Sequence, residues 1–355
     1  MRKYYTRACN FHYGIYARYL IKKKLGLPLC GNKDIAFTDI EILSRKKNEK
    51  IKRINLKLIK SLNKKIKKVV KSDIKKITQK RKKLDKKILS DPSIMGILNL
   101  TPDSFSDGGK YNNIKKSFLH IKNMIKSGAD IIDVGGESTR PGSKDVTHKN
   151  EWKRVFGVIS KFKKKHPNII LSIDTRKSEI MINSIKFKTD IINDVSGFNY
   201  DLKSIDKIKK FNVWKVLHHM QGTPNTMQIK PKYKNVLLDI YDFFEEKLNS
   251  DFKKFKFKKF ILDPGIGFGK NLKHNLILMN NISLFHSLGF PLLVGASRKR
   301  FINQISGKFD SKERLGGTLA SVLYLLTQGV QIFRVHNVRE VKQGILIYKK
   351  IILNK

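Results

Sequence analysis

Short hydrophobic runs recur from residue 94 to residue 336, and a longer amphipathic stretch separates each from the next. A run that is apolar at nearly every position is typical of a strand buried on both faces of a sheet. Eight such runs occur, at residues 94–100, 130–136, 168–174, 190–196, 213–219, 259–265, 291–297 and 330–336. The stretches between them have apolar residues at helical spacing, most clearly at 113–127, 146–164, 233–249 and 311–328.

This alternation of strands and helices predicts βαβ units and therefore a parallel sheet. Eight units are the number that a (β/α)8 TIM barrel contains, and residues 91–355 are close to its usual length. A doubly wound open sheet is the alternative topology, and the number of units argues against it. We therefore expect the α/β class, with one (β/α)8 barrel over residues 91–355.

The first 90 residues lack this alternation. The segment DIAFTDIEIL (34–43) predicts a strand. Apolar residues then recur every three or four positions from Ile51 to Ile77, which predicts a basic amphipathic helix with a short hairpin before it. We expect this helix to lie against the barrel with its lysines in solvent. The predicted organisation is an N-terminal extension at 1–44, a Lys-rich helical segment at 45–90 and a barrel at 91–355.

The chain carries a formal net charge of +46, which raises the hypothesis of a nucleic-acid or anionic-membrane partner. The charge is densest in residues 45–90, which contain 21 basic and 3 acidic residues. The remaining charge is spread along a chain that is also rich in Ile and Asn, and a drift in genome composition produces the same bias. We favour drift, with contact of residues 45–90 with nucleic acid or an anionic membrane as the alternative.

Cysteine usage and hydropathy bear on the compartment. Only Cys9 and Cys30 are present, without a disulfide framework or a CxxC motif, so we expect a reducing, cytoplasmic environment. No uncharged apolar stretch reaches the roughly 18 residues that a transmembrane helix needs. The longest candidate, Gly317–Val330, predicts a buried helix.

Each predicted barrel strand ends in polar residues or glycine. In a (β/α)8 barrel all the carboxyl ends open on one face, where catalytic groups gather. Asp133, Asp174 and Asp263 end the second, third and sixth strands, and Asn193 ends the fourth. Any one of them could simply cap a helix or form an Asx turn. Together they favour a site that pairs with a flat heterocycle such as a pterin or guanine.

Basic residues follow the last two strands, where barrels often hold phosphate. Arg298 and Lys299 follow the seventh strand, and Arg334 and His336 end the eighth. Because arginine presents a planar fork to phosphate oxygens, we expect an anion site here. A Schiff-base role for Lys299 is the alternative. Acids for a heterocycle beside cations for phosphates suit a reaction in which pyrophosphate leaves.

Eight motifs then carry a family resemblance, in the order GILNLTPDSFSDGG, DIIDVGGESTRPGS, SIDTRK, INDVSG, HMQGTPNTMQ, LDPGIGFGKN, LLVGASRKRF and FRVHNV. In these motifs the chain resembles dihydropteroate synthase, a transferase of folate biosynthesis and the target of sulfonamides. The resemblance implies condensation of 6-hydroxymethyl-7,8-dihydropterin diphosphate with p-aminobenzoate to 7,8-dihydropteroate and pyrophosphate. It implies C–O cleavage to a pterin cation that the arylamine traps, a Mg2+ cofactor and a homodimer. Residues 1–44 resemble, more loosely, an N-terminal extension of some bacterial members.

The resemblance also implies roles for individual residues. The pterin contacts are Asp133, Asp174, Asn193, Met220, Asp263 and Lys299. The diphosphate contacts are Asn99, Thr139, Arg334 and His336, and Asn99 is also the metal ligand. The p-aminobenzoate contacts are Phe105, Arg140, Pro141, Phe268 and Ser297. The catalytic residues are Asp174, Lys299, Arg334 and His336. The loops at 100–110 and 137–143 are expected to close over the substrates.

The nearest alternative enzyme is a pterin-binding methyltransferase, a related barrel with similar strand-end acids. That enzyme needs a corrinoid partner domain, and no corrinoid-binding module is recognisable in this sequence. The motifs STRPG and SRK favour the synthase.

Overall fold

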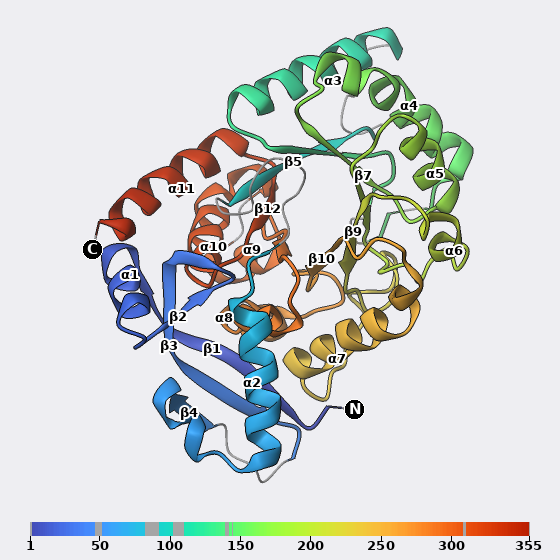
Figure 1. The fold of residues 1–355 in the computed structure, drawn as a ribbon. Coiled ribbons are helices and arrows are strands. Elements are labelled where there is room, and N and C mark those ends of the chain that lie inside the picture. Colours follow the sequence, from blue (N-terminus) through green and yellow to red (C-terminus); the bar gives the residue numbers. More distant parts are fainter. Residues whose placement is uncertain are drawn as a thin grey trace.

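The computed structural model describes residues 2–46, 52–81, 92–101, 110–138, 142–143, 145–307 and 310–354. Eight parallel strands lie in the order β10-β9-β8-β7-β6-β5-β12-β11. A parallel bridge between Leu262 and Leu292 joins the two edges, so the sheet closes into a barrel with helices around its outside (Figure 1). The prediction of a (β/α)8 barrel is therefore confirmed.

Each of the eight predicted runs overlaps a barrel strand. The strands are β5 (Ser93–Asn99), β6 (Ile131–Gly135), β7 (Ile170–Asp174), β8 (Ile191–Asp194), β9 (Trp214–His218), β10 (Phe260–Asp263), β11 (Leu293–Val294) and β12 (Ile332–Val335). The surrounding helices are α3 (Lys110–Lys126), α4 (His148–Lys165), α5 (Ser178–Lys186), α6 (Ser204–Ile208), α7 (Val236–Asn249), α8 (Leu272–Asn280), α9 (Arg300–Ser306), α10 (Leu315–Thr327) and α11 (Val338–Leu353).

Helix α10 corrects two predictions. The helix predicted at 311–328 is divided into a 3-10 turn (Ser311–Glu313) and α10 proper. The expectation that Gly317–Val330 is a buried helix is also wrong in part. Only one side of α10 faces the core, and Tyr324 is 46% exposed. A helix that is apolar on every side can be fully buried, or it can expose one apolar side, and its sequence does not distinguish the two cases.

Side chains alternate between the two faces of each barrel strand, and this alternation places the site. Buried apolar side chains from all eight strands form one cluster of their own: Met95, Ile131, Ile170, Ile191, Trp214, Val216, Ile261, Leu293 and Ile332. Residues two or four positions further along each strand face the same way, toward the interior at the carboxyl end. These residues are Asn99, Asp133, Asp174, Asn193, His218, Asp263 and Arg334.

The N-terminal segment forms a second, antiparallel sheet (Figure 1). Its strands are β1 (Tyr4–Tyr13), β2 (Leu27–Leu29), β3 (Asn32–Ser44) and β4 (Lys52–Asn55), and its helices are α1 (Gly14–Lys22) and α2 (Lys64–Thr78). Strand β3 pairs with the other three, which confirms the strand predicted at 34–43. The apolar side of α2, which includes Val70 and Ile77, packs in the core of this sheet.

The single helix predicted from Ile51 to Ile77 is wrong in its first half. Ile54 pairs with Ile40 in a β ladder, and Leu58 lies in a 3-10 turn (Leu56–Ser61). Asn55 caps that turn and Asn63 caps α2, each accepting a hydrogen bond from a backbone N–H. Two Asn caps within nine positions therefore begin new elements in a segment whose apolar spacing is that of one helix.

The N-terminal sheet is attached to the barrel by buried and half-buried contacts. Arg45 pairs with Asp239 at 2.9 Å and Asp242 at 2.7 Å on α7. The Cys30 thiol lies 3.3 Å from His286 Nδ1, in the segment before β11. The sheet thus packs beside the barrel, against α7 and the segment before β11 (Figure 1). In the described part of the chain, no helix is long and apolar enough to cross a membrane.

Candidate active site

Arg334 joins two acids in the mouth of the barrel. Its Nε donates to Asp133 Oδ2 at 2.7 Å, and a terminal nitrogen donates to Asp174 Oδ2 at 2.7 Å. The Asn193 amide also donates to Asp133 Oδ2, at 3.1 Å. The structure therefore brings together four predicted site residues from β6, β7, β8 and β12. The other Asp133 oxygen is buried and accepts no hydrogen bond from the described residues.

Burial sets the charge state of these acids. It raises the pKa of Asp174 to about 7, an effect that Arg334 opposes and that nearby Asp133 increases. Burial also raises the pKa of Asp263 to about 6, against the Gly265 N–H and the charge of Lys299. Near neutral pH the two carboxyls can therefore be protonated or ionised, so each can donate a hydrogen bond or only accept one.

Lys299 lies over an aromatic ring. Its ammonium is 3.9 Å from the centre of the Phe268 ring, a cation–π contact. Burial and the charge of Arg334 lower the pKa of Lys299 to about 8. Gly267 has φ +83°, and a Cβ there would lie 3.0 Å from Lys299 Cδ. The glycine therefore provides room for the lysine.

The ends of β11 and β12 are joined by Ser297 and His336. The Ser297 hydroxyl lies 3.1 Å from His336 Nδ1 and accepts the backbone N–H of His336 at 3.2 Å. Arg298, expected from the sequence to bind phosphate, instead donates from two nitrogens to Asn337 Oδ1, at 3.1 and 2.8 Å. The backbone of Arg298 has a left-handed φ of +58°. The two hydrogen bonds to Asn337 therefore hold a strained turn between Ser297 and Lys299.

His218 is a wall of the site that sequence reasoning missed. Its ring packs edge-on against Phe268, with centroids 4.6 Å apart, and its Nδ1 lies 2.8 Å from the carbonyl oxygen of Val195. His218 ends β9, and the next residue, His219, packs on the other side against Phe243, with centroids 4.9 Å apart. That alternation is the signal that places His218 inward, where burial holds its pKa well below the usual value.

The remaining predicted residues divide into two groups. Asn99 and Met220 are half-buried, and Asn99 lies beside Asp174. A Cβ added to Gly135 would lie 3.6 Å from Asn99 Oδ1 and 3.5 Å from Asp174 Cβ. Phe105, Thr139, Arg140 and Pro141 lie outside the described residues, as does most of the loop predicted at 100–110.

A closed parallel barrel with acids, an amide and an arginine converging at its strand ends is the framework of a pterin-binding barrel enzyme. In agreement, a family model described as "Pterin binding enzyme" matches residues 95–336. The N-terminal sheet lies outside this match.

Named relatives narrow the class. The dihydropteroate synthase of Escherichia coli K12 is 41% identical over 260 residues, which cover 73% of this chain and 91% of that protein. The solved Yersinia pestis dihydropteroate synthase with a sulfonamide is 38% identical, with a TM-score of 0.69 over 74% of this chain and 95% of that one. The Xanthomonas albilineans enzyme with 4-aminobenzoic acid is 33% identical, with a TM-score of 0.70 over 75% and 94%. The chain belongs to the dihydropteroate synthase family.

Proposed function

We propose that this chain condenses 6-hydroxymethyl-7,8-dihydropterin diphosphate with p-aminobenzoate to give 7,8-dihydropteroate and pyrophosphate in folate biosynthesis. The observation that carries the proposal is the bridge from Arg334 to Asp133 and Asp174, inside a barrel whose relatives are synthases of this kind. The same comparisons argue against a pterin-binding methyltransferase, because the relatives and solved structures named above are dihydropteroate synthases.

In this reaction the C–O bond of the pterin diphosphate breaks first, and its electron pair leaves with pyrophosphate. Asp174, Asp263 and Asn193 hold the pterin ring and stabilise the positive charge that develops on it. The amine nitrogen of p-aminobenzoate then attacks the exocyclic carbon and loses a proton. Phe268 and Ser297 form one side of the pocket for this second substrate, and the ammonium of Lys299, a proposed pterin contact, lies over the Phe268 ring.

Arg334 serves both halves of the reaction. Two of its five N–H groups are used by Asp133 and Asp174. We infer that the remaining N–H groups, together with His336, bind the diphosphate oxygens on which negative charge accumulates. Ionised donors fixed before the reaction stabilise such charge without reorganisation.

A Mg2+ ion fits Asn99. The described residues contain no group of three or more His, Cys, Asp or Glu side chains suited to a metal. Mg2+ commonly takes one or two protein oxygens and completes its shell with water and substrate phosphates. The Asn99 amide oxygen at the end of β5 is a ligand of that kind. When bound, the ion would neutralise charge on the diphosphate.

A homodimer is the proposed assembly. The outer sides of α10 and α11 expose Tyr324, Leu346, Ile347 and Ile351, and large exposed apolar surfaces of this kind mark protein interfaces. Ile347→Glu with Ile351→Glu should shift the sedimentation coefficient from dimer to monomer, and a wild-type monomer at micromolar concentration would contradict the assembly.

The cytoplasm remains the proposed compartment, because both cysteines are free thiols.

The test is direct. The protein is incubated with the pterin diphosphate, labelled p-aminobenzoate and Mg2+, and labelled dihydropteroate and released pyrophosphate are measured together. We expect one pyrophosphate for each dihydropteroate and competition by a sulfonamide against p-aminobenzoate. Absence of labelled product under these conditions would refute the function.

A further inference from the structure

A buried lysine that the proposed mechanism does not use lies next to the site. Lys270 ends the glycine-rich stretch after Asp263, and it is only 2% exposed. A buried amine destabilises a protein unless its hydrogen-bonding groups find partners. Burial holds the pKa of Lys270 well below its usual value, although the charge of Asp263 opposes this effect. The partners of the lysine therefore indicate what it does in the fold.

The ammonium of Lys270 joins the ends of two neighbouring strands. It donates to the carbonyl oxygen of Phe268 at 2.8 Å and to that of His219 at 3.3 Å, and it lies 3.0 Å from His219 Nδ1. His219 follows β9, and Phe268 belongs to the loop of residues 264–271 between β10 and α8. Because β9 and β10 pair in the barrel (Figure 1), one side chain fixes this loop to the neighbouring strand end.

Two further side chains hold the same loop, on either side of the carbonyl that Lys270 binds. Gln228 Nε2 donates to the carbonyl oxygen of Gly267 at 2.9 Å, and the Tyr233 hydroxyl donates to that of Gly269 at 2.7 Å. Both side chains come from the segment between β9 and α7. The carbonyls of three consecutive residues therefore each accept a hydrogen bond from a side chain, and Lys270 holds the central one.

Phe268 connects this loop to the site. Its ring packs edge-on against His218, with centroids 4.6 Å apart, and the ammonium of Lys299 lies 3.9 Å from the ring centre. The side chain is buried. The backbone of Phe268 is thus held by Lys270, and its ring is held by two residues of the mouth. A shift of the loop would displace the ring relative to both.

We propose that Lys270 is a positioning residue for p-aminobenzoate and that it acts by fixing Phe268. The inference rests on the proposed function, in which the Phe268 ring contacts this substrate. Asp133 and Asp174 are held separately by Arg334, so these two pterin contacts do not depend on Lys270. A looser Phe268 therefore weakens binding of p-aminobenzoate more than binding of the pterin diphosphate.

The experiment uses the full chain with Lys270→Met, Lys270→Gln, Phe268→Leu and the double variant Lys270→Met/Phe268→Leu. Lys270→Met keeps the apolar bulk and removes the donors. It should raise the KM for p-aminobenzoate about tenfold, since small displacements of a binding group have effects of this size. Lys270→Gln keeps a donor on a side chain one atom shorter, so its KM should rise about threefold. The affinity for the pterin diphosphate, measured by calorimetry without p-aminobenzoate, and kcat should change less than about threefold.

The double variant tests whether Lys270 acts through Phe268. Phe268→Leu should raise the KM for p-aminobenzoate at least as much as Lys270→Met. In a protein that already lacks the ring, loss of Lys270 should raise this KM no further. Lys215→Met is the matched control, because Lys215 is also a buried lysine that donates to a carbonyl oxygen, that of Phe257 at 3.2 Å, but lies near the amino end of β9. The KM of the control should equal that of the wild type.

Three results would overturn the proposal: a folded Lys270→Met protein with an unchanged KM for p-aminobenzoate, an equal loss of affinity for both substrates, or a double variant with a clearly higher KM than Phe268→Leu. If Lys270→Met does not fold, Lys270→Gln carries the test, alone and combined with Phe268→Leu. A wild-type protein without turnover would refute the proposed function instead, which keeps the two failures distinguishable.

Discussion

Replacing Arg334 by Met removes the guanidinium that pairs with both Asp133 and Asp174. The two contacts are 2.7 Å long, and the acidic side chains are 0% and 5% exposed. Breaking a buried ion pair on one side costs about 3–5 kcal/mol, because the remaining charge stays buried without a partner. Since the Arg334 side chain is 18% exposed, we expect the lower end, a decrease of about 3 kcal/mol in the free energy of unfolding.

This loss should depend on pH in a definite direction. Burial raises the pKa of Asp174 to about 7 in the folded protein, against about 3.9 in an unfolded chain. The folded state therefore holds an extra proton between these values, and stability falls as the pH rises through this window. Without Arg334 the pKa of Asp174 in the folded protein rises further. The stability of the variant therefore keeps falling above pH 7, by about 1.4 kcal/mol per pH unit. The free energy of unfolding of the variant is lower than that of the wild type at both pH values. This difference should be about 2 kcal/mol larger at pH 8.5 than at pH 6.

Urea unfolding of both proteins at pH 6 and pH 8.5 measures this difference. Arg18→Met is the matched control, because Arg18 pairs with Asp34 on the surface, where it is 51% exposed, and such pairs contribute at most about 1 kcal/mol. Turnover by the Arg334→Met protein should fall at least about 100-fold, the usual effect of losing one fixed donor to a developing anion. Equal stability losses at the two pH values would refute the electrostatic reasoning, whatever happens to turnover.

Three further predictions concern the site, the barrel wall and the surface. The pH profile of kcat/KM should rise as Asp263 and Asp174 ionise near pH 6 and 7, and fall as Lys299 loses its proton near pH 8. Lys299→Arg should shift only the alkaline limb of this profile, to higher pH. An unshifted alkaline limb would show that Lys299 is not the group that titrates there. Burial lowers the pKa of Lys215 to about 7 beside Phe255 and Phe260. Lys215→Met should therefore stabilise the fold by about 1–3 kcal/mol at pH 6 and less at pH 10, where the unfolded lysine also loses its proton; thermal denaturation at both pH values checks the sign. Four Lys→Gln changes in α2 (Lys64, Lys68, Lys71 and Lys75) should lower the salt needed to elute the protein from heparin no more than four changes in α4 (Lys149, Lys153, Lys161 and Lys164). A clearly larger effect of the α2 set would favour a polyanion partner for that helix instead.

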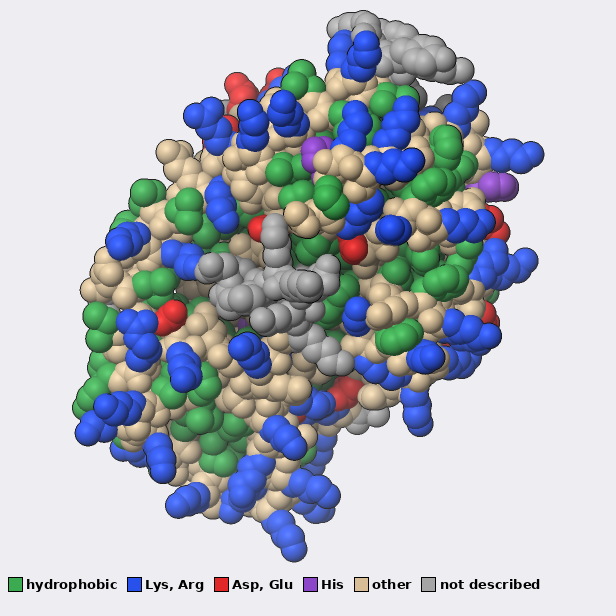
Figure 2. Space-filling view, turned by 45° about the horizontal axis from the view of Figure 1, so that its top comes forward, with side chains coloured by type: hydrophobic (Ala, Val, Ile, Leu, Met, Phe, Trp, Pro, Cys, Tyr) green, Lys and Arg blue, Asp and Glu red, His purple; other side chains and the backbone are tan. Residues whose placement is uncertain are grey.

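The surface agrees with the reasoning behind the last prediction. Figure 2 shows Lys and Arg side chains over the whole of one face, with few acidic side chains among them. Because α2 buries its apolar side in the N-terminal sheet, that side is not available for insertion into a membrane. Contact of residues 45–90 with nucleic acid stays the alternative to a drift in genome composition.

The barrel could be predicted from the sequence because its information is local. A strand buried on both faces is apolar at nearly every position, so it can be recognised from a short stretch of sequence. The motif residues that follow each strand lie at the same face of the barrel, however the helices are arranged. The N-terminal region shows where this reasoning fails. Ile54 has helical spacing to its neighbours, yet its partner is Ile40 in a β ladder, and a ladder partner is not encoded in spacing.

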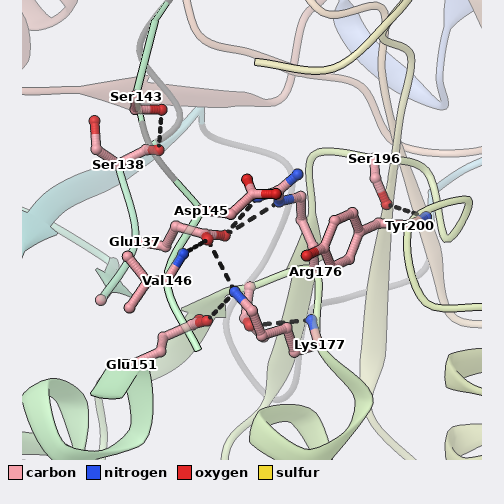
Figure 3. Close-up of polar contacts among 12 residues, drawn as sticks. Glu137, Ser138, Ser143, Asp145, Val146, Glu151, Arg176, Lys177, Ser196 and Tyr200 are labelled. Atoms are coloured by element: carbon pink, nitrogen blue, oxygen red, sulfur yellow. Dashed lines mark hydrogen bonds and ion pairs between the residues drawn. The ribbon is translucent and has the colours of Figure 1, made fainter. Parts of the chain in front are cut away.

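The contacts within the site could not be predicted, because they depend on how the barrel strands are staggered. Arg334 and Asp133 are 201 positions apart, and nothing local determines that they touch. The Glu137–Arg176 ion pair, 2.9 Å long (Figure 3), was missed for the same reason, although both residues stand inside motifs that resemble the family. A buried acid in one motif and a basic pair in the next are a usable signal once the two strands are known to be neighbours.

The ion pairs of Arg334 explain why the acids can remain ionisable in a buried mouth. Asp133 and Asp174 lie on adjacent strands, and without the guanidinium between them burial and the charge of Asp133 would raise the pKa of Asp174 further. One guanidinium opposes that rise and presents its other N–H groups toward the region where pyrophosphate is proposed to leave. In the proposed mechanism, charge separation during C–O cleavage would place the new cation beside carboxylates and the new anion beside arginine. We therefore propose that Arg334, which holds the two acids together, also couples binding of the ring to departure of the leaving group.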